Sequence, residues 1–295
     1  MTHSRTTFSD VLDVLPELFG LCTRGTQVFE FLEQICSRTA IDSGFAKNNS
    51  EQFGSFGQID FPLKNMGAVS SLDLFGLDEM ILFSVYWRLR DRYKTFADLG
   101  ANLGLHSLLA SRLGWAVSAY EPDPETFLQM SENFSKNETS IASYQCAVGS
   151  ADGMRSFTRV RGNLTGSHLS GAKQRPYGDL EEFEVRVQNF RGIVQANDFL
   201  KIDVEGAEAE IFCSTSTADW ETAEAVMEIG SEENAAEIFL HLKRCPGLNI
   251  FSQKRGWNVV VTAEDLPMHH REGSVFISLA DEAPFLKVSS PRAKP

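Results

Sequence analysis

The chain has 295 residues and an ordinary globular composition, with 42% hydrophobic and 23% charged residues, so wholesale disorder is excluded. Its formal net charge of −13 argues against nucleic acid as the main partner, because phosphate binding depends on lysine and arginine. No run approaches the roughly 18 consecutive apolar residues that a membrane span requires, so we expect no membrane partner.

The cysteines and the first residues bear on the cellular compartment. The five cysteines are widely spaced and form no Cys-x-x-Cys motif, which favours reduced thiols over disulfides or a zinc site. The first residues lack the apolar segment of a secretory signal. We therefore predict a cytoplasmic protein. We also predict no metal site, because the adjacent His269 and His270 have no third ligand at a useful spacing.

The first 90 residues differ from the rest of the chain in their pattern of apolar residues. Apolar residues recur at helical spacing in residues 8–21, 27–36 and 72–89, and a strand or hairpin is predicted near residues 55–63. We interpret residues 1–90 as a mainly helical N-terminal extension. We expect it either to cover the binding site of a core domain or to mediate formation of a homodimer.

Residues 91–287 form the predicted core domain. Short apolar runs alternate there with amphipathic helices, a pattern typical of βαβ units and a parallel sheet. We expect the last two strands to form an antiparallel pair, and residues 288–295 to form a flexible tail. In chain order, strands are predicted at residues 95–98, 116–120, 143–148, 155–160, 183–187, 199–203, 225–229, 258–262 and 274–279.

A glycine-containing loop follows the first of these strands. Residues 98–104, Asp-Leu-Gly-Ala-Asn-Leu-Gly, connect the strand to a helix. Glycine allows the backbone to turn sharply and to approach a ligand closely. The next strand ends at Glu121, and an acid at that position suits the two hydroxyls of a ribose. These features predict a nucleoside-bearing cofactor at the carboxyl edge of an open sheet.

The loop also indicates which cofactor is bound. A dinucleotide site prefers Gly-x-Gly-x-x-Gly, and Leu103 stands where the third glycine would fall. Asp98 would repel a pyrophosphate but attract an ammonium or a sulfonium. S-adenosylmethionine carries both cations and no phosphate, so the loop favours S-adenosylmethionine. The alternative is a structural turn in which Asp98 only caps the helix.

Several segments resemble one family. They are residues 98–104, Tyr-Glu-Pro-Asp-Pro at 120–124, Asn133, Cys-Ala-Val-Gly at 146–149 and, most specifically, Leu-Lys-Ile-Asp-Val-Glu-Gly-Ala-Glu at 200–208. Over about residues 94–280 the chain resembles the FkbM family of S-adenosylmethionine-dependent methyltransferases. The resemblance implies an α/β, class I Rossmann-like fold, with a mostly parallel seven-stranded sheet, helices on both faces and a reversed last strand.

The resemblance also implies an activity, which is methylation of a hydroxyl on a small metabolite, sugar or glycoside, with S-adenosylhomocysteine as product. By motif position, Gly100, Ala101 and Asn102 would line the methionine part of the cofactor and Glu121 the ribose. Asp203 would lie where the methyl group meets the acceptor. The full set of predicted cofactor-binding residues is Asp98, Gly100, Ala101, Asn102, Gly104, Glu121, Pro122, Asp123, Ala147, Val148 and Asp203.

Three residues are candidates for catalysis. Asp203 ends a central strand, where ligands bind in open α/β sheets, and could orient the acceptor or take its proton. His168 lies in a polar loop between two predicted strands. The unperturbed pKa of a histidine side chain suits proton transfer near neutrality, so His168 is a candidate general base, and the alternative is a surface histidine without a catalytic role. Glu205 begins a helix, where an acid also stabilises the positive helix end.

Two other functions stay open on the sequence alone. One is an NAD(P)-dependent oxidoreductase, which the mismatch at Leu103 disfavours. The other is a non-catalytic binding subunit with a methyltransferase fold. The combination of Asp98, Gly100, Asn102 and Glu121 argues against it, because a scaffold gains nothing from a pocket of this polarity.

Overall fold

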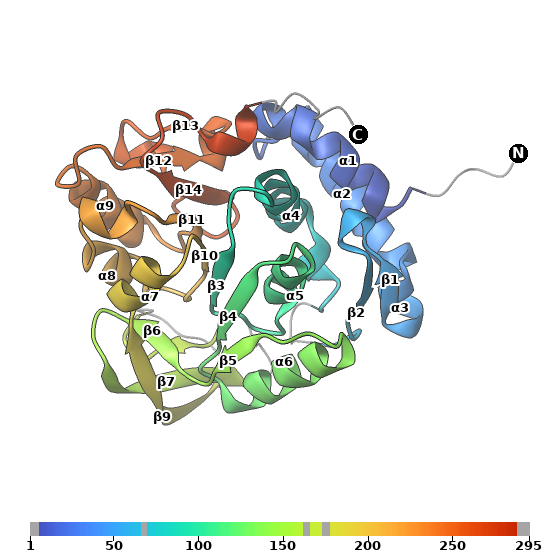
Figure 1. Cartoon of the computed structure of the whole chain (residues 1–295), viewed down its shortest axis with the longest axis horizontal. Coiled ribbons are helices and arrows are strands. Elements are labelled where there is room, and N and C mark those ends of the chain that lie inside the picture. Colours follow the sequence, from blue (N-terminus) through green and yellow to red (C-terminus); the bar gives the residue numbers. More distant parts are fainter. Residues whose placement is uncertain (1–5, 66–69, 162–165, 173–177, 288–295) are drawn as a thin grey trace, which may run out of the picture.

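The structure is a computed structural model that describes residues 6–65, 70–161, 166–172 and 178–287. An eight-stranded sheet lies at its centre, with helices on both faces (Figure 1). From one edge to the other, its strands are β13 (Asn258–Val259), β12 (Asn249–Ser252), β14 (Ser274–Ser278), β11 (Glu224–Glu228), β10 (Phe199–Ile202), β3 (Thr95–Leu99), β4 (Ala116–Tyr120) and β5 (Ala142–Tyr144).

The five strands from β11 to β5 are parallel, whereas β14 is antiparallel to both β11 and β12. The predicted reversed last strand is therefore confirmed. The sheet has eight strands rather than seven, because the two-residue β13 adds to the edge. The predicted antiparallel pairing of residues 258–262 with 274–279 is wrong. The sequence analysis missed β12, a four-residue strand that separates them.

A second, four-stranded sheet lies next to β4 and β5. Its strands, in order, are β6 (Ala147–Gly149), β9 (Asp179–Asn189), β7 (Gly153–Arg161) and β8 (His168–Leu169). The strand predicted at residues 143–148 is thus two strands, one in each sheet. The chain turns between them, where the Cys146 N–H donates to the Tyr144 carbonyl oxygen at 3.0 Å.

Alternation along the strands explains why both faces of the central sheet are covered. Phe96 and Phe199 point to one face, while Ala97 and Leu200 point to the other. Three helices pack on the first face: α4 (Leu77–Leu89), α5 (Leu105–Arg112) and α6 (Pro124–Lys136). Three others pack on the second face: α7 (Phe190–Ala196), α8 (Glu208–Cys213) and α9 (Glu232–Leu242).

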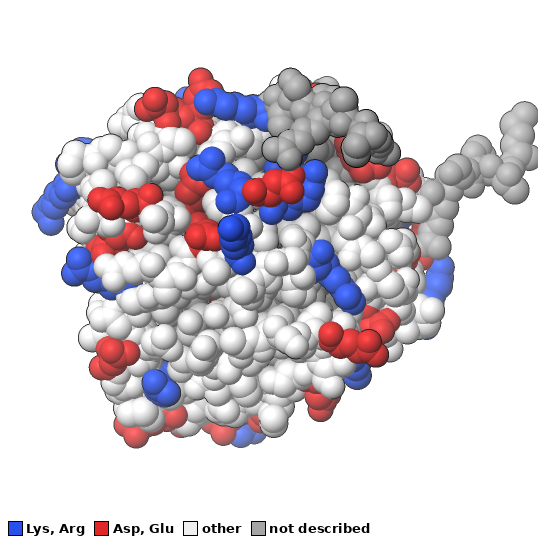
Figure 2. Space-filling view, in the orientation of Figure 1, with Lys and Arg blue, Asp and Glu red and all other residues white. Residues whose placement is uncertain are grey.

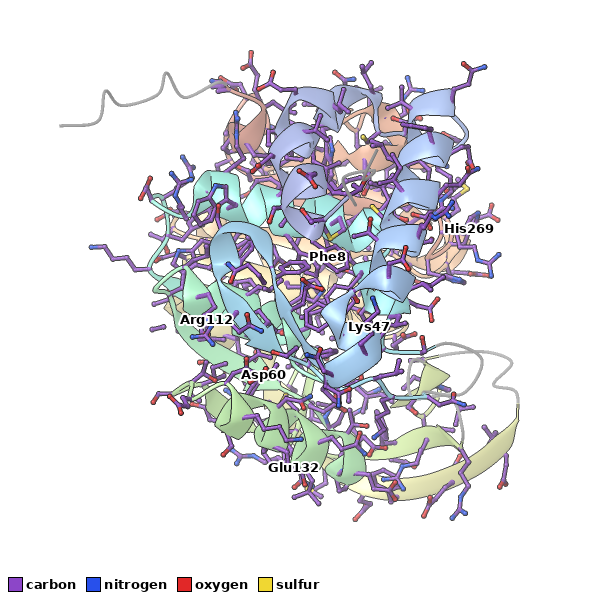
Figure 3. The ribbon with its side chains drawn as sticks, turned by 90° about the vertical axis from the view of Figure 1, so that its right-hand side faces the viewer. Phe8, Lys47, Asp60, Arg112, Glu132 and His269 are labelled. Atoms are coloured by element: carbon purple, nitrogen blue, oxygen red, sulfur yellow. The ribbon has the colours of Figure 1, made fainter. Side chains whose placement is uncertain are left out.

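The N-terminal segment packs over α4. It consists of α1 (Phe8–Leu18), α2 (Gln27–Asp42), α3 (Gly44–Asn48) and a hairpin of β1 (Ser50–Gln52) and β2 (Gln58–Asp60). Figure 3 views the molecule from this side, with Phe8 of α1 near the centre and Glu132 of α6 below it. The Asp60 N–H donates to Asn137 Oδ1, at the end of α6, at 2.9 Å. Because it lies between this segment and the sheet, α4 is apolar on most of its surface.

Single 3₁₀ turns connect several elements, and one of them shortens the helix predicted at 72–89, which begins only at Leu77. The 3₁₀ turns are Phe19–Leu21, Gly54–Phe56, Asp73–Phe75, Thr217–Trp220, Gln253–Arg255, Ala263–Asp265 and Pro284–Leu286.

The remaining predictions concern the cysteines, a membrane span, the charge of the chain and the C-terminal tail. All five cysteines are free thiols. Among the residues described, no helix has both the length and the apolar character needed to cross a membrane. Figure 2 shows acidic and basic side chains interspersed on the face seen in Figure 1. The predicted tail, residues 288–295, lies outside the described residues.

Candidate active site

The loop after β3 is fastened to the ends of two neighbouring strands. The N–H groups of Gly100 and Ala101 both donate to the Tyr120 carbonyl oxygen, at 3.0 and 2.9 Å. Gly100 has a φ of 73°, and a Cβ there would lie 1.8 Å from the Asp203 carbonyl oxygen. A side chain at Gly100 would therefore collide with backbone in a conformation that L-residues seldom adopt. The loop brings together the carboxyl ends of β3, β4 and β10.

Glu121, directly after β4, is held by two backbone groups. Its Oε2 accepts from the Asn102 N–H and its Oε1 from the Asp123 N–H, each at 2.9 Å. Burial raises the pKa of Glu121 to about 7, although the two hydrogen bonds act in the opposite direction. The carboxyl group of Glu121 therefore titrates near neutrality.

Asn102 leaves one buried acceptor unsatisfied. Its φ is 50°, and its Oδ1 is buried without a hydrogen-bond partner among the described residues. An unpaired buried acceptor costs about 1–3 kcal/mol. A ligand that donates a hydrogen bond to Asn102 would remove that cost.

A cavity of about 640 Å³, partly open to solvent, lies over these groups. We call it the first cavity. Residues at the ends of β3, β4 and β10 line one part of it, and residues of the second sheet line another. Its lining residues are Gly100, Asn102, Tyr120, Glu121, Pro122, Asp123, Thr126, Cys146, Ala147, Val148, Phe157, Ser167, Leu169, Asp203, Val204 and Glu205.

Lys201 connects the loop to Asp203. Its Nζ donates to the Gly100 carbonyl oxygen at 3.1 Å and to Asp203 Oδ2 at 3.0 Å, and lies 3.8 Å from Asp98 Oδ1. Burial lowers the pKa of Lys201, but the carboxylates of Asp203, Asp98 and Glu79 outweigh burial and hold the pKa above its ordinary value. Lys201 therefore stays charged and does not act as a base.

A second cavity, of about 1100 Å³ including open solvent, adjoins the first at Asp203. It lies between the carboxyl ends of β10 and β11 and the N-terminal segment. Asp203 lines both cavities. The lining residues of the second cavity are Arg24, Glu33, Asp73, Gly76, Leu77, Asp78, Glu79, Leu82, Lys201, Ile202, Asp203, Val226, Met227, Glu228, His270, Arg271, Gly273 and Ser274.

Comparison with known families agrees with the motifs in the loop and in β10. The sequence model described as the methyltransferase FkbM domain matches residues 98–245, about half of the chain. This chain belongs to the FkbM methyltransferase family. S-adenosylmethionine is therefore the methyl donor of this FkbM methyltransferase. The family match also excludes the alternative of a nicotinamide-dependent oxidoreductase. No curated protein matches the sequence significantly.

Solved structures resemble this FkbM methyltransferase only distantly. The N-terminal domain of human METTL16 is 13% identical over 95% of this chain and 96% of its own, with a TM-score of 0.40. The S-adenosylhomocysteine-bound methyltransferase PaMTH1 of Podospora anserina is 9% identical over 68% and 78%, with a TM-score of 0.35. The precorrin-6y C5,15-methyltransferase of Geobacter metallireducens is 13% identical over 68% and 86%, also with a TM-score of 0.35. These similarities are too low to indicate what this methyltransferase acts on.

Eight of the predicted cofactor-binding residues line the first cavity of the FkbM methyltransferase, and three do not. Asp98 is fully buried, and its Oδ2 accepts from Ser107 Oγ at 2.7 Å. Ala101 is also buried. Gly104 precedes α5 with a φ of 83°, and a Cβ there would lie 2.4 Å from the Phe134 ring. Asp98 and Gly104 thus do not line the first cavity, and they hold the loop through their contacts with Ser107 and Phe134.

Asp123 lines the first cavity but is already engaged by other groups. Its Oδ1 caps α6 by accepting from the N–H groups of Glu125 and Thr126, at 2.9 and 3.1 Å. Its Oδ2 accepts from Arg159 Nε at 2.5 Å. Asp123 therefore ties α6 to β7 beside the cavity.

The other two catalytic candidates are in different positions. Glu205 lines the first cavity, and its φ of 53° is uncommon for a residue with a side chain. His168 is buried in β8, with its Nδ1 2.9 Å from the Gly166 carbonyl oxygen. Its neighbours Ser167 and Leu169 line the first cavity, whereas His168 is not among the lining residues.

The sequence analysis missed two groups of lining residues. Phe157, Ser167 and Leu169 reach the first cavity only because β7 and β8 pair within the second sheet. Arg24 reaches the second cavity from the N-terminal segment, and Glu79 reaches it from α4. No local motif marks either group, since long-range packing determines their positions. Glu228, which also lines the second cavity, is marked by the sequence because it lies at the end of a predicted strand.

Proposed function

We propose that this FkbM methyltransferase methylates a hydroxyl oxygen of a small metabolite, sugar or glycoside. The observation that carries the proposal is the position of Asp203, which lines both cavities. The first cavity would hold the cofactor and the second the acceptor. A carboxylate at their junction is close to the place where an acceptor hydroxyl and a methyl group would meet.

The first cavity offers groups that fit the parts of the cofactor. Glu121 would accept hydrogen bonds from the ribose hydroxyls, and Ala147 with Val148 would line the adenine edge. Gly100 and Asn102 would contact the methionine part, where the unpaired Oδ1 of Asn102 can accept from the ammonium group. S-adenosylmethionine supplies a methyl group whose bond to sulfur breaks as its bond to the acceptor oxygen forms, with the electron pair remaining on sulfur.

In this mechanism Asp203 accepts a hydrogen bond from the acceptor hydroxyl and then takes its proton. The Lys201 ammonium, 3.0 Å away, fixes the direction of the carboxylate. A carboxylate is a sufficient base, because the hydroxyl proton becomes much more acidic as the new carbon–oxygen bond forms. Holding the acceptor in line supplies a further part of the rate enhancement.

Glu205 and His168 have secondary roles in the proposal. Glu205 adds negative charge to the first cavity, which favours a bound sulfonium. His168 would act through the packing of β8 against the cavity, with its Nδ1 close to the backbone of Gly166.

Product analysis tests the proposal. We expect incubation with S-adenosylmethionine and a panel of hydroxylated metabolites to give S-adenosylhomocysteine and a product whose new methyl group is bonded to oxygen by NMR. A new methyl group bonded to nitrogen or carbon would contradict O-methylation.

Replacing Asp203 with Asn tests its assigned role with the same acceptor. We expect Asp203→Asn to lower kcat by about 100-fold, in the range typical of general-base catalysis. Its affinity for S-adenosylhomocysteine, measured by calorimetry, should change less than about threefold. Equal losses in both quantities would instead make Asp203 a cofactor-binding residue.

A further inference from the structure

The second cavity is unusually acidic for the binding site of a neutral hydroxyl compound. We propose that it binds an acceptor that carries a protonated amine beside the hydroxyl to be methylated. This inference rests on the proposed function above, because it takes the second cavity as the acceptor site. It names the chemical class of the acceptor, which is an amino sugar or another amino alcohol.

The charges that line the second cavity do not cancel. Six carboxylates line it, against two arginines, one lysine and one histidine. Arg24 Nη2 lies 2.7 Å from Asp78 Oδ2, and Lys201 is paired with Asp203. Both pairs are therefore neutralised within the protein. Arg271 is exposed at the rim.

Glu228 is the clearest uncompensated group. It lies at the end of β11, and no hydrogen bond or ion pair reaches its carboxylate from the described part of the chain. Burial, followed by the negative charges of Asp203, Glu205 and Glu79, raises the pKa of Glu228 well above its ordinary value. A cation bound in the second cavity would relieve this repulsion between like charges.

Glu79 supplies a second acceptor from the opposite wall. Its Oε2 is buried and lies 2.9 Å from His106 Nε2, without the alignment of a hydrogen bond. Burial raises the pKa of Tyr86 well above its ordinary value, so its hydroxyl stays protonated and can donate to His106 Nδ1, at 2.9 Å. Oε2 of Glu79 thus receives no hydrogen bond within the described part of the chain.

An ammonium group matches these two carboxylates better than other occupants do. It has three hydrogen-bond donors and no acceptor, and its positive charge would offset the negative charge gathered around Glu79 and Glu228. A neutral sugar that displaced water would leave this negative charge unbalanced. Among the described residues, no three His, Cys, Asp or Glu side chains are arranged to hold a metal ion. The geometry therefore favours an organic cation.

Calorimetry on the protein saturated with S-adenosylhomocysteine tests the inference. The probes are two matched pairs: D-glucosamine with N-acetyl-D-glucosamine, and 2-aminocyclohexanol with its N-acetyl derivative. We expect at least one amine to bind about tenfold or more tightly than its neutral partner, a difference of about 1.4 kcal/mol. Equal or tighter binding of the neutral partners, or no amine binding at millimolar concentration, would overturn the inference.

Variants locate the preference within the second cavity. Glu228→Gln and Glu79→Gln should each reduce the amine preference severalfold or more and leave the affinity for S-adenosylhomocysteine unchanged. Glu233→Gln, at an exposed position on α9, is the matched control and should keep the preference. A preference that survives both cavity substitutions would overturn the inference. Failure of the folded protein to bind S-adenosylhomocysteine would instead contradict the proposed function itself.

Discussion

At the scale of single residues, the cofactor loop depends on backbone contacts that only certain residues permit. Gly100 leaves room for the Asp203 carbonyl oxygen, and the buried Glu121 carboxylate receives two backbone N–H groups. Burial of the Glu121 side chain also disfavours its ionised form. Its pKa rises from an ordinary 4.5 to about 7, so the folded protein binds more protons than the unfolded chain between these values. The stability contributed by Glu121 therefore falls as pH rises from about 4.5 to about 7.

Replacing Gly100 with Ala tests the close approach of the loop to β10. The new Cβ would lie 1.8 Å from the Asp203 carbonyl oxygen, so the loop must move and we expect a loss of at least about 3 kcal/mol in the free energy of unfolding. Gly114→Ala is the matched control, because Gly114 has a similar φ of 82° but no atom within 4 Å of the added Cβ. It should cost only about 1 kcal/mol. Similar urea denaturation curves for the two variants would contradict the assigned contact.

The sequence marks these residues because their signals are local. The loop at 98–104, Glu121 at a strand end and Asp203 after β10 are each recognisable from a few neighbouring residues. The structure separates their roles further, since Asp98 and Gly104 lie behind the loop and do not line the first cavity. Whether a residue of the loop is buried behind it or lines the first cavity depends on contacts with α6 and with Lys201. Local sequence patterns do not specify these contacts.

At the scale of elements, Arg159 joins the second sheet to α6. It lies 2.5 Å from Asp123, 2.8 Å from Glu125 and 3.1 Å from Glu181, and its guanidinium group stacks over the Phe183 ring. These contacts involve β7, β9 and the first turn of α6. They set the position of the wall that carries Phe157 and Leu169 over the first cavity.

Arg159→Gln should lower the free energy of unfolding by about 3 kcal/mol, because it leaves the buried Asp123 carboxylate without its cation. Arg161→Gln is the matched control. The Arg161 side chain is 58% exposed, and within the described ranges its ion pair is with Glu181, at 3.3 Å, so its loss should cost less than about 1 kcal/mol. Urea denaturation measures both, and a larger effect for Arg161→Gln would show that the network does not stabilise the fold.

The elements were predicted only in part. The alternation of strands and helices predicted the parallel sheet, and the resemblance to the FkbM family implied its reversed last strand. It did not reveal β12, nor the separation of β5 from β6, because strand pairing joins segments far apart in the chain. The short β12 also carries few residues from which a period could be recognised.

At the scale of the whole molecule, the N-terminal segment and the sheet share one apolar core. Phe53 packs edge-on against Phe83 of α4, with ring centroids 5.8 Å apart, and Tyr86 of the same helix packs against Phe96 and Phe199 of the sheet. The N-terminal segment also supplies Arg24 to the second cavity, and α4 supplies Glu79. Its predicted role as a cover thus has a physical basis in shared packing.

We therefore expect a single cooperative unfolding transition in calorimetry. Phe75→Ala should shift that whole transition, with a loss of about 3–5 kcal/mol, because Phe75 is buried among Phe8, Phe45 and Phe53. Phe31→Ala, at a 64% exposed position on α2, should leave the transition nearly unchanged. Two resolved transitions, of which Phe75→Ala moves only one, would contradict a shared core.

The affinity for S-adenosylhomocysteine at pH 6 and pH 8 tests the central claim, that the first cavity holds the cofactor through Glu121. The ionised carboxylate accepts hydrogen bonds from both ribose hydroxyls, so a pKa of about 7 in the free protein predicts binding about tenfold tighter at pH 8. Glu121→Gln should bind more weakly and equally at both pH values. Equal pH dependence of the variant and the natural protein, or no binding by the folded natural protein, would contradict the claim.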